Sequence, residues 1–95
     1  MTIIEYEDYE WDDAKAEINK QKHSVSFREA VTVFDDPLSE LLDDSQHSDQ
    51  EERQILMGES DARRLLVLCF TERPNATRII SARLATKGEA KRYGA

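Results

Sequence analysis

The most regular pattern of hydrophobic positions in the chain lies in its first third. Four apolar side chains recur there at the i, i+3, i+4 and i+7 spacing of one helix face: Phe27, Ala30, Val31 and Phe34. Ser26 and Glu29 stand at the spacing of a capping box at the start of this stripe. Pro37 follows the stripe, and the residue before a proline avoids helical geometry. The pattern therefore predicts a helix between Ser26 and Pro37.

The residues before this helix carry a thinner apolar pattern. Trp11, Ala14 and Ile18 fall on one face of a predicted helix over about residues 13–23, which Asp12 is placed to cap. The other positions are mostly charged or amide, so we expect this helix at the surface. Aromatic and acidic residues mix ahead of it, which predicts a short strand.

Apolar runs with short polar connections fill the second half of the chain. They predict strands at about residues 38–42, 53–58, 64–72 and 77–84. The third of these strands is apolar at every position from Leu65 to Phe70, as expected at the centre of a sheet. The polar, acidic stretch 43–52 is predicted to be a loop.

The last predicted strand and the residues after it complete the architecture. Simple alternation puts Ile79, Ser81 and Arg83 on one face of that strand, and the other face then holds Arg78, Ile80 and Ala82. Thr86 and Glu89 form a second capping box, which predicts a short C-terminal helix. The order of elements predicts one α+β domain over residues 1–95, with two N-terminal helices packed on an antiparallel sheet and a short C-terminal helix.

Composition limits the class of protein. Cys69 is the only cysteine and lies inside an apolar run, so a disulfide framework is excluded and a reducing compartment is expected. No apolar stretch approaches the ~20 residues that cross a bilayer, and the acidic N-terminus lacks the apolar region of a signal peptide. We therefore expect a soluble, cytoplasmic protein without a membrane partner.

Charge is distributed unevenly along the chain. Residues 1–62 hold 18 acidic and 5 basic side chains, a balance of −13, whereas residues 63–95 hold 8 basic and 2 acidic ones, a balance of +6. The two sum to the net charge of −7. A basic segment can bind phosphate locally even in an acidic protein. Any polyanion that this protein binds should therefore contact its C-terminal third.

Two arginines are the first candidates for phosphate chemistry. Arg64 opens the central strand and Arg83 closes the last one, so the two are predicted to meet at one end of the sheet, with Arg73 and Arg78 at the other. Two guanidinium groups beside one phosphate would stabilise the charge of a transition state. The alternatives are a simple ion pair between Arg83 and a nearby glutamate, and charged strand ends that discourage edge association.

Two further residues could transfer a proton. His23 ends the first predicted helix, where the helix dipole favours a protonated imidazole, although a histidine there is also a common cap. Glu52 stands where the acidic loop enters the next strand and is a candidate base, with a solvated charge run as the alternative. Neither histidine of the chain has a second His or Cys at i+3 or i+4, so we predict no metal site and no cofactor.

A set of short strings spans about residues 9–93 in a fixed order. It comprises Tyr9-Glu10-Trp11-Asp12, Lys22-His23-Ser24-Val25-Ser26-Phe27, Phe34-Asp35-Asp36-Pro37, His47-Ser48, Glu51-Glu52-Arg53, Thr71-Glu72-Arg73 and Arg78-Ile79-Ile80-Ser81-Ala82-Arg83. Together these strings resemble the BrnT family, toxins of bacterial type II toxin–antitoxin pairs.

The resemblance implies a RelE-like α+β fold and an endoribonuclease that cleaves RNA without a metal and inhibits translation. It also implies a BrnA-type antitoxin, a DNA-binding ribbon-helix-helix protein, in a complex such as a hetero-tetramer that represses its own operon. The 2′-hydroxyl of RNA is the nucleophile in chemistry of this class, so the protein supplies a proton shuttle and charge stabilisation.

The resemblance also suggests roles for the candidate residues. Arg64 and Arg83 would hold the scissile phosphate, and His23 or Glu52 would transfer the proton. The supporting RNA contacts would be Lys22 and Arg73, and the Trp11 ring would stack on a base unless the first helix buries it.

Two positions depart from the pattern of the family. Ser24 stands where glycine is common, so the turn after His23 is expected to hold a strained φ. Leu84 replaces a common lysine, which would weaken RNA binding. Two other functions stay open from sequence: an inactive toxin homologue that acts as partner of a DNA-binding antitoxin in operon control, and a plain peptide-binding module.

Overall fold

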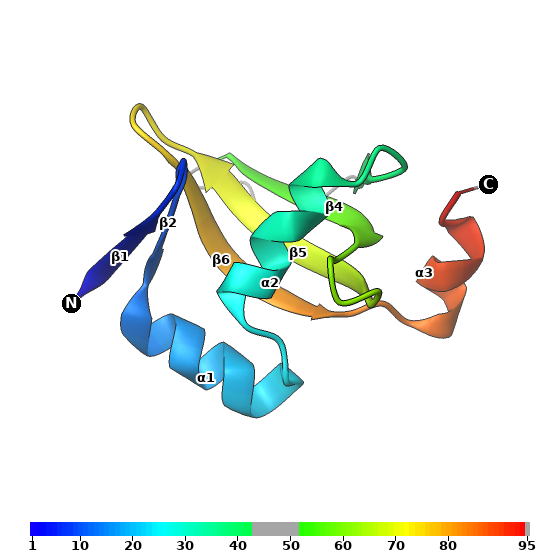
Figure 1. Ribbon diagram of the computed structural model, residues 1–95, viewed down its shortest axis with the longest axis horizontal. Helices are drawn as coiled ribbons and strands as arrows, with labels where there is room; N and C mark the ends of the chain where they lie inside the picture. The colour runs from blue at the N-terminus through cyan, green and yellow to red at the C-terminus, as the bar shows by residue number, and fades with distance from the viewer. Residues whose placement is uncertain (43–51, 95) are drawn as a thin grey trace.

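A computed structural model describes residues 1–42 and 52–94 of the chain (Figure 1). Six strands form one sheet in the order β1-β2-β6-β5-β4-β3. All neighbouring strands are antiparallel except β2 and β6, which pair in parallel. In chain order the elements are β1 (Ile3–Tyr6), β2 (Tyr9–Asp12), α1 (Asp13–His23), α2 (Phe27–Val31), a 3-10 helix (Thr32–Asp35), β3 (Glu40–Leu42), β4 (Arg53–Glu59), β5 (Leu65–Glu72), β6 (Thr77–Leu84) and α3 (Lys87–Arg92).

The α+β class is confirmed, with differences in the helices and in the sheet. The Asp12 side chain caps α1 as predicted. The second helix is shorter than its apolar stripe, because α2 ends at Val31 and the chain continues as a 3-10 helix to Asp35. The prediction of a fully antiparallel sheet is wrong for the strands formed by the N-terminal residues. The first residues form a hairpin of two strands, and its second strand joins β6 in parallel. Of the predicted loop 43–52, all but residue 52 lies outside the described residues.

Helices α1 and α2 cover one side of the sheet, which we call the helix face (Figure 1). The strands contribute alternate side chains to the core on this face, among them Leu66, Leu68 and Phe70 of β5. Phe27 of α2 packs on them and is 2% exposed. The intervening side chains of the strands point to the opposite side, which we call the far face.

A β-bulge decides which residues of β6 point to which face. Cys69 pairs with Ser81, but the next residue of β5, Phe70, pairs with Ile79, so Ile80 has no partner in the β5–β6 pairing. Ile79 and Ala82 therefore both lie in the core, 2% and 1% exposed. The alternation predicted from sequence is wrong at this point, because it assumed no bulge. The consequence for function is that Arg78 and Arg83 share the far face.

A buried amide fixes the end of α1 against β6. Asn19 is 6% exposed, and its Nδ2 donates to the carbonyls of Val25 and Ala82 at 3.0 and 2.9 Å. The backbone N–H of Ala82 donates back to its Oδ1 at 3.1 Å. The next turn of chain ends the helix at Ser24, with φ 58° and ψ 32°. The left-handed backbone expected at Ser24 is therefore confirmed.

Candidate functional site

Arg64 lies on the helix face of the sheet. Its Nε and Nη2 donate to the two carboxylate oxygens of Glu29 at 2.9 and 2.5 Å, and Nη2 also donates to the carbonyl of Ser24 at 2.9 Å. The hydroxyl of Ser60 donates to the same carboxylate at 2.7 Å. The hydrogen bonds from Arg64 lower the pKa of Glu29, against the opposing effect of burial, and the Ser60 hydroxyl adds to the lowering. Arg64 therefore joins β5 to α2 and to the end of α1.

Arg83 lies at the same end of the sheet but on the far face. Its direct cross-strand partner is Val67. Nη1 and Nη2 donate to the two carboxylate oxygens of Glu89 in α3, at 2.8 and 2.9 Å. These hydrogen bonds are the main cause that lowers the pKa of Glu89 to about 2. Glu89 also accepts from the backbone N–H of Thr86 and so completes the capping box of α3.

The predicted meeting of Arg64 and Arg83 is therefore corrected. Both lie at one end of the sheet, but their side chains leave it on opposite faces, and each is held by a different carboxylate. The cause is strand alternation, since Arg64 is in phase with Leu66 and Arg83 is paired with Val67. No single phosphate can contact both guanidinium groups in this arrangement.

Glu52 is separated from both arginines. It precedes β4, whose first residue Arg53 pairs with Thr71, while the last residue Glu59 pairs with Leu65 beside Arg64. The seven residues of β4 thus separate Glu52 from the end of the sheet that holds Arg64 and Arg83. At about 3.3 Å per residue, this separation is roughly 20 Å. Glu52 instead lines a hollow with Gln54 and Glu72.

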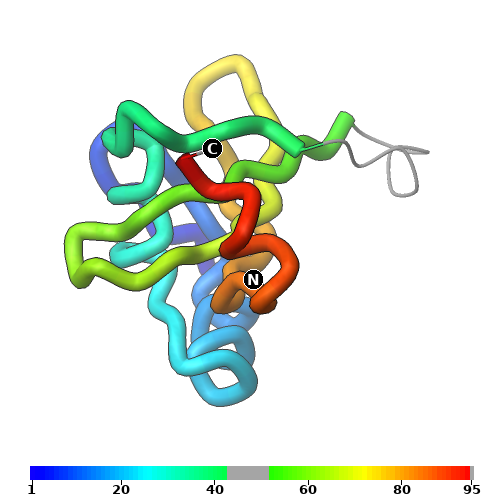
Figure 2. Tube along the Cα trace, turned by 90° about the vertical axis from the view of Figure 1, so that its right-hand side faces the viewer, coloured from blue at the N-terminus to red at the C-terminus, as the bar shows by residue number. Residues whose placement is uncertain are grey.

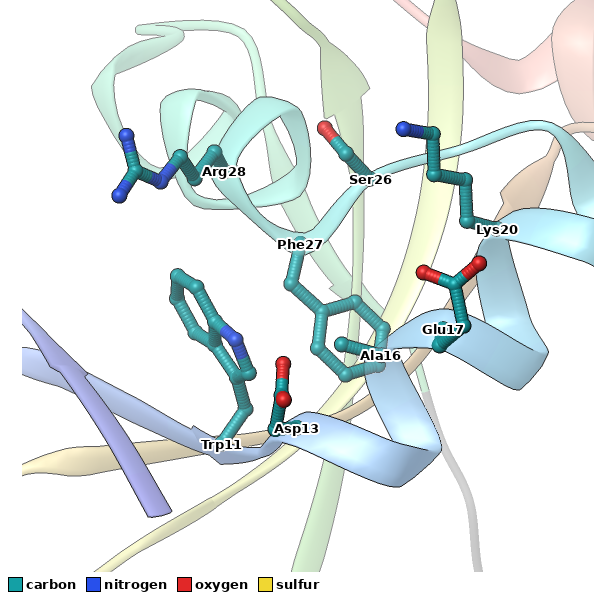
Figure 3. A pocket seen from close by; sticks show the side chains of 8 residues that line it. All are labelled: Trp11, Asp13, Ala16, Glu17, Lys20, Ser26, Phe27 and Arg28. Carbon is teal, nitrogen blue, oxygen red and sulfur yellow. The ribbon is translucent and has the colours of Figure 1, made fainter. Parts of the chain in front are cut away.

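Two predicted residues of α1, Lys22 and His23, and Trp11 of β2 lie around the helix face. Lys22 is exposed and His23 is half-buried in the last turn of α1, next to the Ser24 carbonyl that Arg64 binds. Trp11 is 4% exposed and packs edge-on against Phe27, with ring centroids 5.9 Å apart. Its ring lines a hollow between α1 and α2 (Figure 3). Of the two alternatives for Trp11, stacking on a base or burial under the first helix, the structure therefore shows burial.

Basic side chains gather at the other end of the far face. They line a hollow, which we call the arginine pocket, formed by Asp12, Lys15, Arg53, Arg73, Arg78, Ile79 and Ile80. Four of these seven side chains are cationic and one is acidic. A local excess of positive charge in a concave site attracts a polyanion. Arg73, expected to support RNA binding, is one of its members.

Cross-strand pairing explains how the pocket forms. Arg53 on β4 pairs with Thr71 on β5, and Thr71 pairs with Arg78 on β6. Arg78 in turn pairs with Glu10 on β2, whose carboxylate accepts from its Nε and Nη2, both at 2.7 Å. The contact with Glu10 uses one edge of the Arg78 guanidinium group. Of its five N–H donors, enough remain for an anion that accepts two hydrogen bonds.

Sequence reasoning placed Arg78 at the correct end of the sheet but gave no role to Arg53 or Lys15. The available signal was the position of Arg53 at the start of one strand and of Arg78 near the start of another, two strands apart in the sheet. That signal has meaning only once the register is known, because a shift of one residue moves a side chain to the other face.

None of the helices in the described ranges is both long and apolar enough to cross a membrane. Within residues 1–42 and 52–94, no three His, Cys, Asp or Glu side chains gather as candidate metal ligands.

Fold and site together define a small α+β protein with a cationic pocket on the uncovered part of its sheet. A family model described as "Ribonuclease toxin, BrnT, of type II toxin-antitoxin system" matches residues 11–89. Because that match spans most of the sequence, the chain belongs to the BrnT family of ribonuclease toxins.

A solved structure supports the fold. The crystal structure of the Brucella abortus ribonuclease toxin BrnT, determined at 1.1 Å resolution, superposes with a TM-score of 0.63 at 20% sequence identity. The match covers 81% of this chain and 94% of that one. At this identity the likeness establishes the shared fold. A search among curated proteins finds no match.

Proposed function

We propose that this protein is a metal-independent endoribonuclease whose RNA substrate binds in the arginine pocket. The observation that carries the proposal is the set of cationic side chains from α1, β4, β6 and the residue after β5 around one hollow, in a chain of the BrnT family. A guanidinium group is always charged and matches a phosphate in a bidentate way. The pocket therefore suits a phosphodiester better than a neutral ligand.

The reaction that fits this site uses the ribose 2′-hydroxyl as nucleophile. Its oxygen forms a bond to the adjacent phosphorus as the bond to the 5′-oxygen breaks, which leaves a 2′,3′-cyclic phosphate and a 5′-hydroxyl end. The proton of the 2′-hydroxyl passes to a base, and the leaving oxygen takes up a proton. We assign stabilisation of the extra phosphorane charge to Arg53, Arg73 and Arg78. Asp12 is the carboxylate that lines this pocket and is our candidate base.

The roles expected from sequence are redistributed in this proposal. Arg73, expected as a supporting RNA contact, is now assigned to the reacting phosphate. Arg64 is assigned to the stability of the fold, because its guanidinium already binds Glu29 and Ser24. His23, Lys22 and Glu52 are left as candidates for contacts with RNA outside the pocket.

We further propose that a BrnA-type, DNA-binding antitoxin neutralises the protein in the cytoplasm, and that free toxin inhibits translation. The family description, a toxin of a type II toxin–antitoxin system, supports a protein antitoxin as partner. Complementary charge supports the same partner, since residues 1–62 carry a balance of −13 and a DNA-binding protein carries a basic surface.

One observation favours a second candidate function, that of an inactive toxin homologue retained for operon control. Both arginines that sequence assigns to the scissile phosphate are paired with carboxylates, Arg64 with Glu29 and Arg83 with Glu89. In this alternative the protein binds its antitoxin but cleaves nothing.

Induced expression with and without the antitoxin separates the two functions. We expect the wild-type protein to slow growth and lower bulk protein synthesis, Arg78→Ala to lose this effect, and Arg28→Ala, on the helix side, to keep it. Purified protein should cleave RNA to 5′-hydroxyl ends equally well with and without EDTA. Normal growth, unchanged translation and intact RNA with the wild-type protein would establish the inactive partner instead, and loss of cleavage in EDTA would refute metal independence alone.

A further inference from the structure

The short C-terminal helix α3 lies against the far face and is held there by polar contacts. None of its six residues is buried. Glu89 binds Arg83, and Arg92 lies 3.6 Å from a carboxylate oxygen of Glu40. Just after the helix, the Tyr93 hydroxyl donates to Asp36 at 2.5 Å. Figure 2 looks onto this end of the molecule, with the C-terminal segment in orange and red.

The register of the sheet shows what α3 covers. Glu40, Met57, Val67 and Arg83 are neighbours in one cross-strand row over four strands. The two residues at the ends of this row are the ones that α3 binds. The two in the middle are buried, Met57 at 0% and Val67 at 4% exposure. The helix therefore crosses the strands and forms a cover over that row.

Arg83 connects this cover to the arginine pocket. Along β6 the residues Arg78, Ser81 and Arg83 point to the far face. Arg78 lies in the pocket and Arg83 lies under α3, roughly 15 Å further along the strand. The carboxylate of Glu89 meets Arg83 in the bidentate geometry that a phosphate would adopt. Glu89 thus binds Arg83, the next cationic position after the pocket along β6, through the donors that a phosphate could also use.

We propose that α3 is a displaceable cover, and that an RNA phosphate competes with Glu89 for Arg83. RNA bound in the arginine pocket then continues along β6, and its binding lifts α3 from the sheet. This inference rests on the proposed function, since it takes RNA as the ligand of the pocket.

Two features make displacement by an RNA strand physically reasonable. The pair is partly exposed, with side-chain exposures of 41% for Arg83 and 25% for Glu89, and exposed ion pairs contribute little to stability. The helix itself has no buried apolar side chain, so the apolar cost of its release is confined to the exposure of Met57 and Val67 beneath it. Only molecules with α3 lifted can bind RNA along β6. The apparent affinity for RNA is therefore the intrinsic affinity multiplied by the fraction of molecules in this open state.

The test measures binding of an RNA with 2′-O-methyl groups, which cannot be cleaved, by fluorescence anisotropy at low salt. Glu89→Gln removes the charge but keeps a residue that is accepted in a capping box. We expect this variant to bind roughly three- to ten-fold more tightly than wild type. Glu17→Gln, on the helix side, removes the same charge and controls for general electrostatics. In an Arg83→Ala background the Glu89→Gln change should have no effect.

Equal affinities for Glu89→Gln and Glu17→Gln would overturn the cover, as would a gain that persists without Arg83. Hydrogen exchange gives an independent readout, since amides of α3 should lose protection when RNA is added and keep it if RNA stays in the pocket alone. The proposed function fails separately, when wild-type protein does not cleave normal RNA. Absence of RNA binding by every variant would overturn both proposals together.

Discussion

Arg53 and Arg78 project from the same face of the sheet on either side of Thr71, and β5 is the only strand between them. Neighbouring strands lie about 4.8 Å apart, which puts the two backbone positions roughly 10 Å from each other. Two arginine side chains can reach one phosphate across that distance. Thr71, the residue of β5 that pairs with both, is buried at 2% exposure.

Removal of either guanidinium group should strongly impair RNA cleavage. Arg53→Ala and Arg78→Ala are each expected to lower kcat/KM on a synthetic RNA by about 100- to 1,000-fold, or about 2.7–4 kcal/mol, because each removes charge stabilisation of the transition state. Arg28→Ala is the matched control, since Arg28 stacks on the Tyr6 ring on the helix side, with Cζ 4.9 Å from its centroid. Cleavage by Arg53→Ala or Arg78→Ala within twofold of that control would remove the residue from the site.

Arg64 should matter for stability and not for catalysis. Arg64→Ala leaves the carboxylate of Glu29, 14% exposed, without its main partner. We expect a loss of about 1–3 kcal/mol in the free energy of unfolding, toward the lower value because Arg64 itself is 34% exposed. Urea denaturation measures this loss, and kcat/KM of the folded fraction should be unchanged. A catalytic defect with normal stability would return Arg64 to the active site.

The elements of this fold follow from local patterns, but the site does not. Capping residues and apolar spacing at Asp12, Ser26 and Thr86 predict where the three helices begin. Strand positions follow in the same way from runs of apolar residues. These signals lie within a few residues of one another, so a single sequence contains them.

Which residues meet across the sheet depends on long-range register, which no local pattern contains. One unpartnered residue, Ile80, reverses the face assigned to every residue of β6 on one side of it. The parallel pairing of β2 with β6 was equally hidden, because it joins residues about 70 positions apart: Glu10 with Arg78. That pairing supplies the carboxylate that orients an arginine of the pocket, and so the sequence alone could not show that these side chains meet.

Acid should weaken the contact between α3 and the sheet over a defined range of pH. The pKa of Glu89 is about 2 in the folded protein against 4.5 ordinarily, so its pair with Arg83 stabilises the fold fully above pH about 4.5. This contribution is lost as the pH falls from about 4.5 to 2. Because the pair is partly exposed, we expect about 1 kcal/mol at neutral pH.

Urea denaturation of wild type and Glu89→Gln at a series of pH values measures this contribution. The difference in unfolding free energy should stay constant between pH 7 and 5 and then shrink toward zero by pH 2. The difference in unfolding free energy between wild type and Arg83→Ala should vary with pH in the same way, since this variant breaks the same ion pair. A difference that grows on acidification would contradict the assignment.

Ser24 should be a site where glycine stabilises the protein. Its φ of 58° lies in the left-handed region, which costs a residue with a Cβ atom about 1–2 kcal/mol and costs glycine nothing. Glycine also gives the unfolded chain more conformational freedom than serine does, which offsets part of this gain. Ser24→Gly should therefore raise the free energy of unfolding by about 0.5–1 kcal/mol, which thermal and urea denaturation can measure.

The same substitution at a second serine isolates the backbone effect. Ser81 lies in β6 with an exposed side chain and the extended backbone of a strand. There the change to glycine should destabilise by about 0.5–1 kcal/mol, since the unfolded state gains freedom and no strain is relieved. The carbonyl of Ser24 that Arg64 binds belongs to the backbone, so Ser24→Gly keeps that contact and should keep RNA cleavage. Equal effects at the two serines would show that the turn after His23 holds no strain.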